Sequence, residues 1–254
     1  MQVDVLFDPF GGRWDDLHAA AVEAEAAGFD GVWVYDHLAG SVHRAPHVLE
    51  CWTVLTAIAA TVPRLRVGSL VLNVANRRPG TLAVAAATLQ EVSGGRLLLG
   101  LGAGGGPSTP YAAEQRALGR RVPGDIARRR AVEAAVAELR GTWSGTMGGV
   151  GGFLVPHPAP PIVIGGFGPK MAELAGRVGD GINVPGGPAL EPLVAIARRA
   201  NAAVGHDPDR FVVTTSAAPH TMAGRRFEDV GVDRVILMVS PPYLEGVRRL
   251  ADLV

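Results

Sequence analysis

Apolar and polar residues alternate along this chain in blocks rather than singly. Short apolar runs, mostly without internal polar alternation, are separated by longer Ala-rich segments that carry the charged residues. Such apolar runs are typical of strands buried on both faces of a parallel sheet, and the segments between them are typical of helices. The pattern predicts eight strands, at residues 3–7, 31–35, 65–72, 96–102, 161–166, 181–184, 211–217 and 233–239.

Local stop signals mark several of the intervening helices. Gly28 ends the first helix, Pro63 follows the second, and Gly94 and Gly95 end the third. The predicted helices cover residues 14–28, 48–62, 80–95, 125–143, 169–179, 190–205 and 243–254.

The order of these elements indicates a barrel. Eight parallel strands alternating with helices in 254 residues match a (β/α)8 TIM barrel; an open doubly wound sheet is the alternative. No stretch resembles an interdomain linker, so residues 1–254 are expected to form one barrel domain. A Gly/Pro-rich excursion follows the fourth strand, from Gly104 to about Pro123, and residues 144–160 form a second such loop, long enough for a hairpin. The C-terminal part is shortened, because only about 15 residues (218–232) separate the last two strands.

Composition narrows the class of partner. The 24 basic residues balance 24 acidic ones, so neither a nucleic acid nor a membrane is an expected partner. A single cysteine, Cys51, excludes an intramolecular disulfide and lies in an apolar stretch, as a small core residue does. The N-terminus lacks the regions of a signal peptide, and no apolar run approaches the roughly 18 residues that span a bilayer. We therefore expect a cytoplasmic protein.

The stretch "RLLLGLGAGGG" (96–106) contains the spacing G-x-G-x-x-G, at Gly100, Gly102 and Gly105. A dinucleotide-binding loop would need a helix to open directly after the glycines, since the helix N-terminus holds the pyrophosphate. Here the next strong helix begins near Asp125, and the glycines follow the fourth strand rather than the first. We therefore interpret them as part of the barrel mouth, where they would let a flat ligand approach the backbone.

Polar residues and glycines gather where the predicted strands end. The C-terminal ends of barrel strands form the active-site face of this fold. The residues expected there are Asp8, Tyr35, Asp36, His37, Asn73, Asn76, Arg77, Arg78, the strand-four glycines, "GGFGPK" (165–170) and Asn183.

Four segments, in order, carry a resemblance to a known family. They are "AEAAGFDGVWVYDHL", "RLRVGSLVLNVANRRPGTLAVAAATLQEVSGGRLLLGLGAGGG", "YAAEQRALG" and "PPIVIGGFGPKMAELAGRVGDGINV". Together they resemble the luciferase-like monooxygenase superfamily, in its deazaflavin- or flavin-dependent oxidoreductase branch. The resemblance implies a bacterial-luciferase-like (β/α)8 barrel, often a homodimer, that binds coenzyme F420 or FMN at its mouth.

The resemblance also implies roles for individual residues. His37 and Asp36 correspond to the catalytic pair beside the ring where hydride is exchanged. A non-prolyl cis peptide is implied at Leu70–Val71, behind the ring. Asn73 would reach the pyrimidine edge of the ring, and Ala103 and Gly104 would lie near it. The cofactor phosphate would be held by the loop of Gly165, Gly166, Phe167, Gly168, Pro169 and Lys170, through its free backbone N–H groups at a helix start.

Two positions depart from the family pattern. Some deazaflavin enzymes of the family keep a glutamate just after the strand-four glycines as a proton donor, where this chain has Gly105. A tryptophan often found a few residues past the histidine is also missing, with Ser41 near that place.

Each candidate also has a plainer interpretation. Asp36 could cap the next segment, His37 could be structural, and Glu114 could face solvent on a short helix. Arg77 and Arg78 could be a solvated pair or could bind an anionic group. The histidines show neither HxH nor HExxH spacing, so no metal site is predicted.

The sequence thus favours an F420-dependent oxidoreductase that transfers hydride between the deazaflavin and a small organic substrate. One alternative is an FMN-dependent monooxygenase, in which O₂ reacts with the reduced ring. The other is a non-catalytic paralogue that binds or carries the cofactor.

Overall fold

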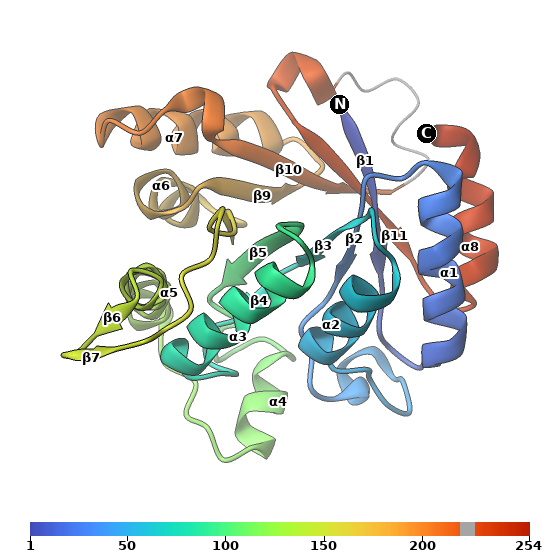
Figure 1. Cartoon of the computed structure of the whole chain (residues 1–254), viewed down its shortest axis with the longest axis horizontal. Coiled ribbons are helices and arrows are strands. Elements are labelled where there is room, and N and C mark those ends of the chain that lie inside the picture. The colour runs from blue at the N-terminus through green and yellow to red at the C-terminus, as the bar shows by residue number, and fades with distance from the viewer. Residues whose placement is uncertain (219–226) are drawn as a thin grey trace.

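A computed structural model describes residues 1–218 and 227–254, and its strands close into a parallel barrel (Figure 1). The barrel strands are β1 (Gln2–Phe7), β2 (Gly31–Val34), β3 (Arg66–Ser69) with its continuation β4 (Leu72–Asn73), β5 (Leu97–Gly102), β8 (Ile162–Gly165), β9 (Gly181–Pro185), β10 (Val212–Ala217) and β11 (Arg234–Val239). β1 pairs with β11 and β3 pairs with β5, so the sheet has no free edge. The predicted TIM barrel is confirmed.

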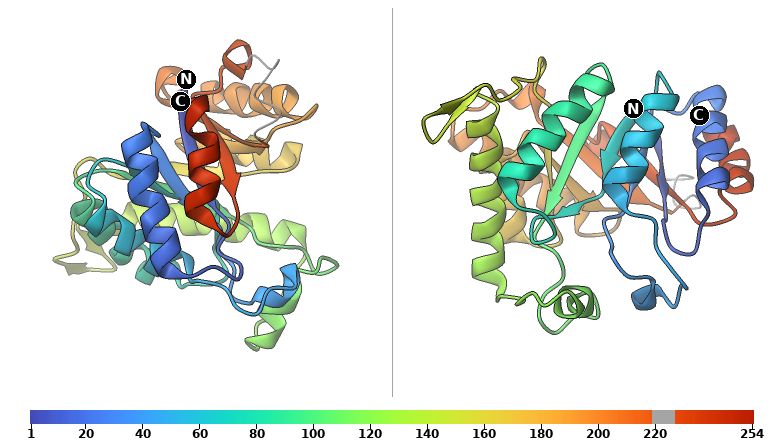
Figure 2. Two further views of the ribbon diagram at one scale, coloured as in Figure 1. Left: turned by 90° about the vertical axis from the view of Figure 1, so that its right-hand side faces the viewer. Right: turned by 60° about the horizontal axis from the view of Figure 1, so that its bottom comes forward.

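Helices cover the outside of the strands in all the ribbon views (Figures 1 and 2). They are α1 (Trp14–Ala27), α2 (Cys51–Thr61), α3 (Pro79–Val92), α5 (Asp125–Thr142), α6 (Pro169–Val178), α7 (Leu190–Ala203) and α8 (Tyr243–Leu250). These agree with the predicted helices to within a few residues, except that α8 ends earlier and is followed by the 3-10 helix η5 (Ala251–Leu253). Within the described ranges, no helix has the length and apolar character needed to cross a bilayer.

The irregular segments fall where the sequence places them. The excursion after β5 contains the short helix α4 (Ala112–Ala117), and the second loop contains the antiparallel hairpin β6 (Thr146–Met147) and β7 (Val150–Gly151). Before β11, the described part of the shortened crossover is the 3-10 helix η4 (Phe227–Val230). The rest of that predicted crossover lies outside the described residues.

Two layers of core hold the barrel together. The larger lies between strands and helices; the smaller fills the barrel interior with Leu6, Trp33, Leu70, Leu98 and Ile236. Near the N-terminal ends of the strands a buried ion pair closes the interior. Asp4 accepts from Nε1 of Trp33 at 2.7 Å and from the Arg234 guanidinium at 2.6 and 2.7 Å. This end is therefore filled, and the site must lie at the other.

We expect Gly100→Ala to destabilise the barrel strongly. A Cβ at Gly100 would lie 1.8 Å from the backbone oxygen of Ser69, and backbone inside a closed sheet cannot move aside. The overpacking should cost about 3 kcal/mol of unfolding free energy, measured by urea denaturation.

Gly151→Ala is the control, because its Cβ would approach nothing closer than Oγ1 of Thr146 at 3.8 Å. If both variants unfold at the same urea concentration, the steric argument is wrong.

Candidate active site

The third barrel strand is interrupted by a bulge at the mouth. A non-prolyl cis peptide joins Leu70 to Val71, between β3 and β4. Leu70 is buried in the inner core and Val71 is partly buried against it. The cis peptide predicted at this bond is confirmed, whereas the contact of these residues with a cofactor ring stays a prediction.

The glycines around the bulge make room for it. A Cβ at Gly102 would lie 2.5 Å from Cγ2 of Val71, and one at Gly165 would lie 2.8 Å from the same methyl group. At Gly104, where φ is +66°, a Cβ would lie 2.4 Å from Nδ2 of Asn73. Val71 and Asn73 thus occupy the space into which side chains at these positions would extend. The interpretation that the strand-four glycines give clearance to a flat ring stays a prediction.

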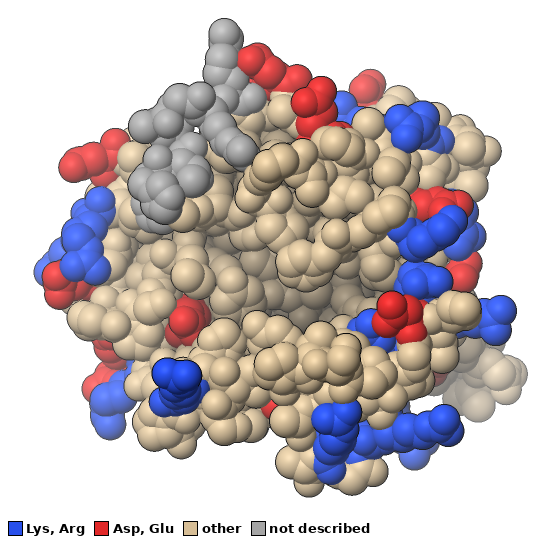
Figure 3. Space-filling view, turned by 180° about the vertical axis from the view of Figure 1, so that it is seen from behind, with Lys and Arg blue, Asp and Glu red and all other residues tan. Residues whose placement is uncertain are grey.

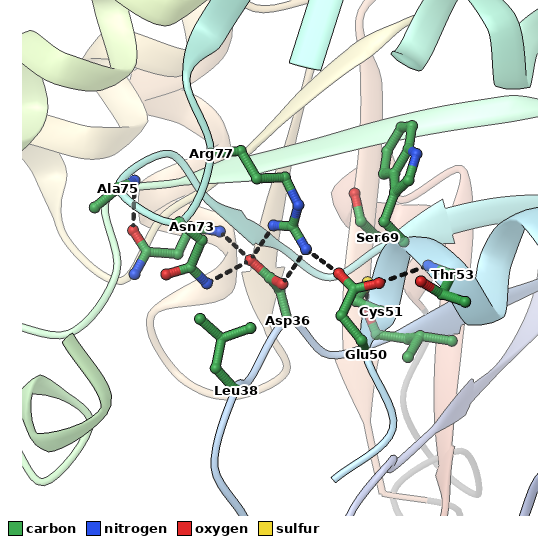
Figure 4. A network of polar contacts seen from close by, with 12 residues as sticks. Asp36, Leu38, Glu50, Cys51, Thr53, Ser69, Asn73, Ala75 and Arg77 are labelled. Atoms are coloured by element: carbon green, nitrogen blue, oxygen red, sulfur yellow. Dashed lines mark hydrogen bonds and ion pairs between the residues drawn. The ribbon is translucent and has the colours of Figure 1, made fainter. Parts of the chain in front are cut away.

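Asp36 follows β2, and its carboxylate is the centre of a buried polar network (Figure 4). Oδ2 accepts from the backbone N–H of Asn73 at 2.9 Å and from Nδ2 of Asn76 at 3.0 Å. The Arg77 guanidinium donates to both carboxylate oxygens at 2.9 Å. Four donors satisfy the charge without water. The Asp36 carboxylate therefore holds the end of β4 and the segment after it in place, whereas a catalytic role for Asp36 stays a prediction.

Arg77 joins this carboxylate to a second one. It also pairs with Glu50, which accepts from the N–H of Thr53 at 2.7 Å and so caps α2. Burial opposes the charge on Arg77, but its bonds to Asp36 and Glu50 outweigh burial and raise the pKa of the guanidinium. The interpretation of Arg77 as a solvated residue was wrong, because its side chain is only 19% exposed. Arg78, by contrast, is exposed.

Cys51 begins α2 and lies next to Asp36 and Glu50 (Figure 4). It is fully buried, which confirms the prediction of a core residue. Burial raises the pKa of its thiol well above the usual value. The thiol is therefore structural and unreactive.

His37 is held from behind by a buried acid. Its Nδ1 lies 2.9 Å from Oε1 of Glu114, and Oε2 of Glu114 accepts from the N–H of Leu38 at 3.1 Å. Glu114 is 5% exposed, so the interpretation that it faces solvent was wrong. Nε2 of His37 has no hydrogen-bond partner among the residues that the structure describes.

Aromatic rings surround the histidine. The ring centroids of Phe10, Tyr111 and His43 lie 5.1, 5.3 and 5.8 Å from that of His37, and Tyr35 lies 6.3 Å away. Burial, together with the charge of Asp8 and the neighbouring Tyr111, raises the pKa of Tyr35 to about 12. The Tyr35 hydroxyl therefore keeps its proton at ordinary pH and can donate a hydrogen bond.

The excursion helix α4 completes the site, and sequence reasoning missed this. Besides Glu114, it supplies Gln115, whose Nε2 donates to Oδ1 of Asn76. Asn76 in turn donates to Asp36, so the networks around Asp36 and His37 both end on α4. Two adjacent polar residues buried in a six-residue helix are unusual. Nothing local in the sequence, however, indicates which strand ends they contact.

The loop 165–170 connects β8 to α6. The N–H of Gly166 donates to Asn183 O at 3.0 Å, and Gly168 precedes Pro169 at the first position of α6. The N–H groups of residues 167, 168 and 170 have no acceptor among the described residues. Phe167 is 88% exposed, so these donors lie at the surface. Lys170 is also exposed and pairs with Glu173 at 3.2 Å.

The remaining predicted residues lie at or below the mouth. Ala103 is partly buried, and its carbonyl oxygen accepts from Arg128 at 3.3 Å. Asn183 is buried and donates to Thr214 at 2.8 Å, so it belongs to the barrel wall. Seen from behind, the molecular surface is hollowed at its centre, where uncharged side chains dominate (Figure 3). In the described part of the chain, no group of three His, Cys, Asp or Glu side chains could hold a metal ion.

Comparison with known proteins identifies the family. The profile described as luciferase-like monooxygenase matches residues 5–226, and this chain belongs to that family.

Individual relatives give a narrower comparison. The chain is 33% identical over 187 residues to the F420-dependent glucose-6-phosphate dehydrogenase of Beutenbergia cavernae, covering 69% of this chain and 54% of the relative. It is 30% identical over 200 residues to the 5,10-methylenetetrahydromethanopterin reductase of Methanolobus tindarius, covering 76% and 58%. The chain thus spans little more than half the length of these curated relatives.

A solved structure matches the whole fold. An F420-dependent secondary alcohol dehydrogenase, in complex with an F420–acetone adduct, superposes with a TM-score of 0.85 at 18% identity, covering 100% of this chain and 98% of the other. At that identity the likeness establishes the fold alone.

We expect Arg77→Met to be among the most destabilising substitutions at the mouth. It would leave the Asp36 carboxylate buried without its cation, which should cost about 3–5 kcal/mol of unfolding free energy in chemical denaturation. Arg78→Met is the matched control, because that side chain is exposed and has no ion pair within the described residues. Equal stability of the two variants would contradict a structural role for the Asp36–Arg77 pair.

Proposed function

We propose that this chain binds coenzyme F420 at the barrel mouth and transfers hydride between it and a small organic substrate. The observation that carries the proposal is the loop 165–170, with its unsatisfied backbone N–H groups at a helix start. Such groups are ready donors for a phosphate. The F420-dependent relatives favour the deazaflavin over FMN.

The other residues fit a bound deazaflavin. The cis Leu70–Val71 bulge would support the ring, Asn73 would meet its pyrimidine edge, and Ala103 and Gly104 would border it. When bound, F420 supplies a ring that accepts or donates hydride and, unlike a flavin, resists reaction with O₂. The protein's own contribution is to orient the ring and to place a proton-exchanging group beside the substrate. We assign that last role to His37 and a positioning role to Asp36.

We expect Phe167→Glu to weaken F420 binding about fivefold. The side chain is exposed, so the fold should not change, but the new carboxylate would stand beside the phosphate. Like charges a few ångströms apart in water repel by about 1 kcal/mol, which is about a factor of five in Kd. Phe167→Gln has the same shape without the charge and should bind F420 within about twofold of wild type. Fluorescence titration measures both.

The same titration with FMN decides between cofactors. Tight FMN binding without F420 binding would overturn the choice of deazaflavin, and binding of neither would overturn the site. Binding of F420 without turnover of any donor would favour the carrier alternative.

We expect His37→Ala to impair hydride transfer far more than cofactor binding. Loss of a general acid–base typically lowers rates by about 10²–10⁴-fold. F420 reduction with 2-propanol as trial donor measures the rate, and the F420 titration should change by less than about twofold. His157→Ala, in an exposed loop, is the control. Unchanged turnover in His37→Ala would make His37 a bystander.

Of the remaining assignments, the homodimer rests on the family resemblance, and the single domain and the location rest on the sequence. We propose that residues 1–254 act as one barrel domain, that the protein is cytoplasmic and that it pairs as a homodimer. Light scattering of the purified protein would test the last point.

A further inference from the structure

The buried carboxylate of Glu114 contacts the one histidine to which we assign proton exchange. An ionised carboxylate can only accept hydrogen bonds. With an ionised Glu114 as acceptor, the 2.9 Å contact is the one that the Nδ1–H tautomer of His37 makes. In the neutral ring this leaves Nε2 bare, and Nε2 has no partner within the described residues.

We propose that Glu114 is a positioning residue that holds His37 as the Nδ1–H tautomer, with Nε2 turned toward a substrate hydroxyl or carbonyl oxygen. This inference rests on the proposed function. In the oxidation direction the alcohol O–H breaks and its proton passes to Nε2. With F420 bound, the deazaflavin would supply the acceptor for the hydride that leaves the adjacent C–H with both bonding electrons as the C=O bond forms. Reduction runs the same steps in reverse, with Nε2–H returning the proton.

The rings beside His37 support the assignment. Phe10, Tyr111 and His43 pack around the imidazole, so its orientation is restricted by contacts as well as by Glu114. A histidine with one nitrogen bound to a carboxylate and the other unpartnered is arranged for proton exchange.

The local chain path explains why the acid comes from α4 and not from position 105. A Cβ at Gly105 would lie 2.5 Å from Oγ1 of Thr109 and 2.6 Å from Cβ of Tyr111. The turn that brings Tyr111 and α4 onto the mouth thus excludes a side chain at 105. The same turn delivers Glu114 to His37, so an acid reaches the site by a different route.

Nitrogen-15 NMR of the cofactor-free protein tests the tautomer directly. The His37 resonances are assigned by their loss in His37→Gln. In wild-type protein, at a pH high enough for the His37 ring to be neutral, we expect a protonated Nδ1 and a bare Nε2. In Glu114→Gln the single amide oxygen must serve both His37 and Leu38, so the Nε2–H form should rise to a substantial fraction. Glu91→Gln, on an exposed part of α3, should leave the spectrum unchanged.

A second variant separates positioning from mere anchoring of α4. Gln115→Leu removes the bond to Asn76 but leaves Glu114 and His37 in place, so it should lower the melting temperature without changing the tautomer. The proposal is overturned if wild-type His37 carries its proton on Nε2, if Glu114→Gln keeps the wild-type tautomer, or if Gln115→Leu shifts it equally. Failure of F420 to bind would instead overturn the proposed function, because the tautomer is measured without cofactor.

Discussion

The mouth of this barrel depends on the satisfaction of one buried charge. The Asp36 carboxylate at the end of β2 is shielded from water and draws its donors from Asn73 at the end of β4 and from the segment that follows. That segment must therefore return over the end of β2, and Arg77 must turn inward to Asp36 and Glu50 (Figure 4). Because removing one partner of a buried pair leaves an uncompensated charge, the loop has little freedom to move. These contacts join the ends of β2 and β4 to the start of α2.

A chain of polar contacts continues from Asp36 to α4, in the excursion after β5. Asn76, bound to Asp36, accepts a hydrogen bond from Gln115, and the preceding residue, Glu114, contacts His37. Asp36 and His37 are neighbours in sequence but point into different networks. The two networks converge on α4, so a helix of six residues, too short to be stable alone, is fixed by polar contacts at two adjacent positions.

Strand order, helix order and the cis peptide could be predicted because their signals are local or carried by the family pattern. The buried runs predict the strands, and the glycines and prolines between them predict the breaks. The parts that could not be predicted depend on contacts between residues that are far apart in the chain. His37 and Glu114 are 77 residues apart, and Asn76 and Gln115 are 39 apart. No periodicity in "YAAEQRALG" distinguishes a buried glutamate from a solvated one. The glycines show the same limit, since their spacing indicates a need for space but not that Val71 and Asn73 would fill it.

The absence of an acid at position 105 follows from the path of the excursion, which leaves no room for a side chain there. A family pattern compared position by position suggests a lost function there, because glycine cannot exchange a proton. In the fold, Thr109 and Tyr111 pack over Gly105 in the turn that leads into α4, the helix that carries Glu114. A side chain at 105 and this path of the excursion exclude each other. The chemistry available at the mouth is therefore set by the route of the loop as much as by the residues at the strand ends.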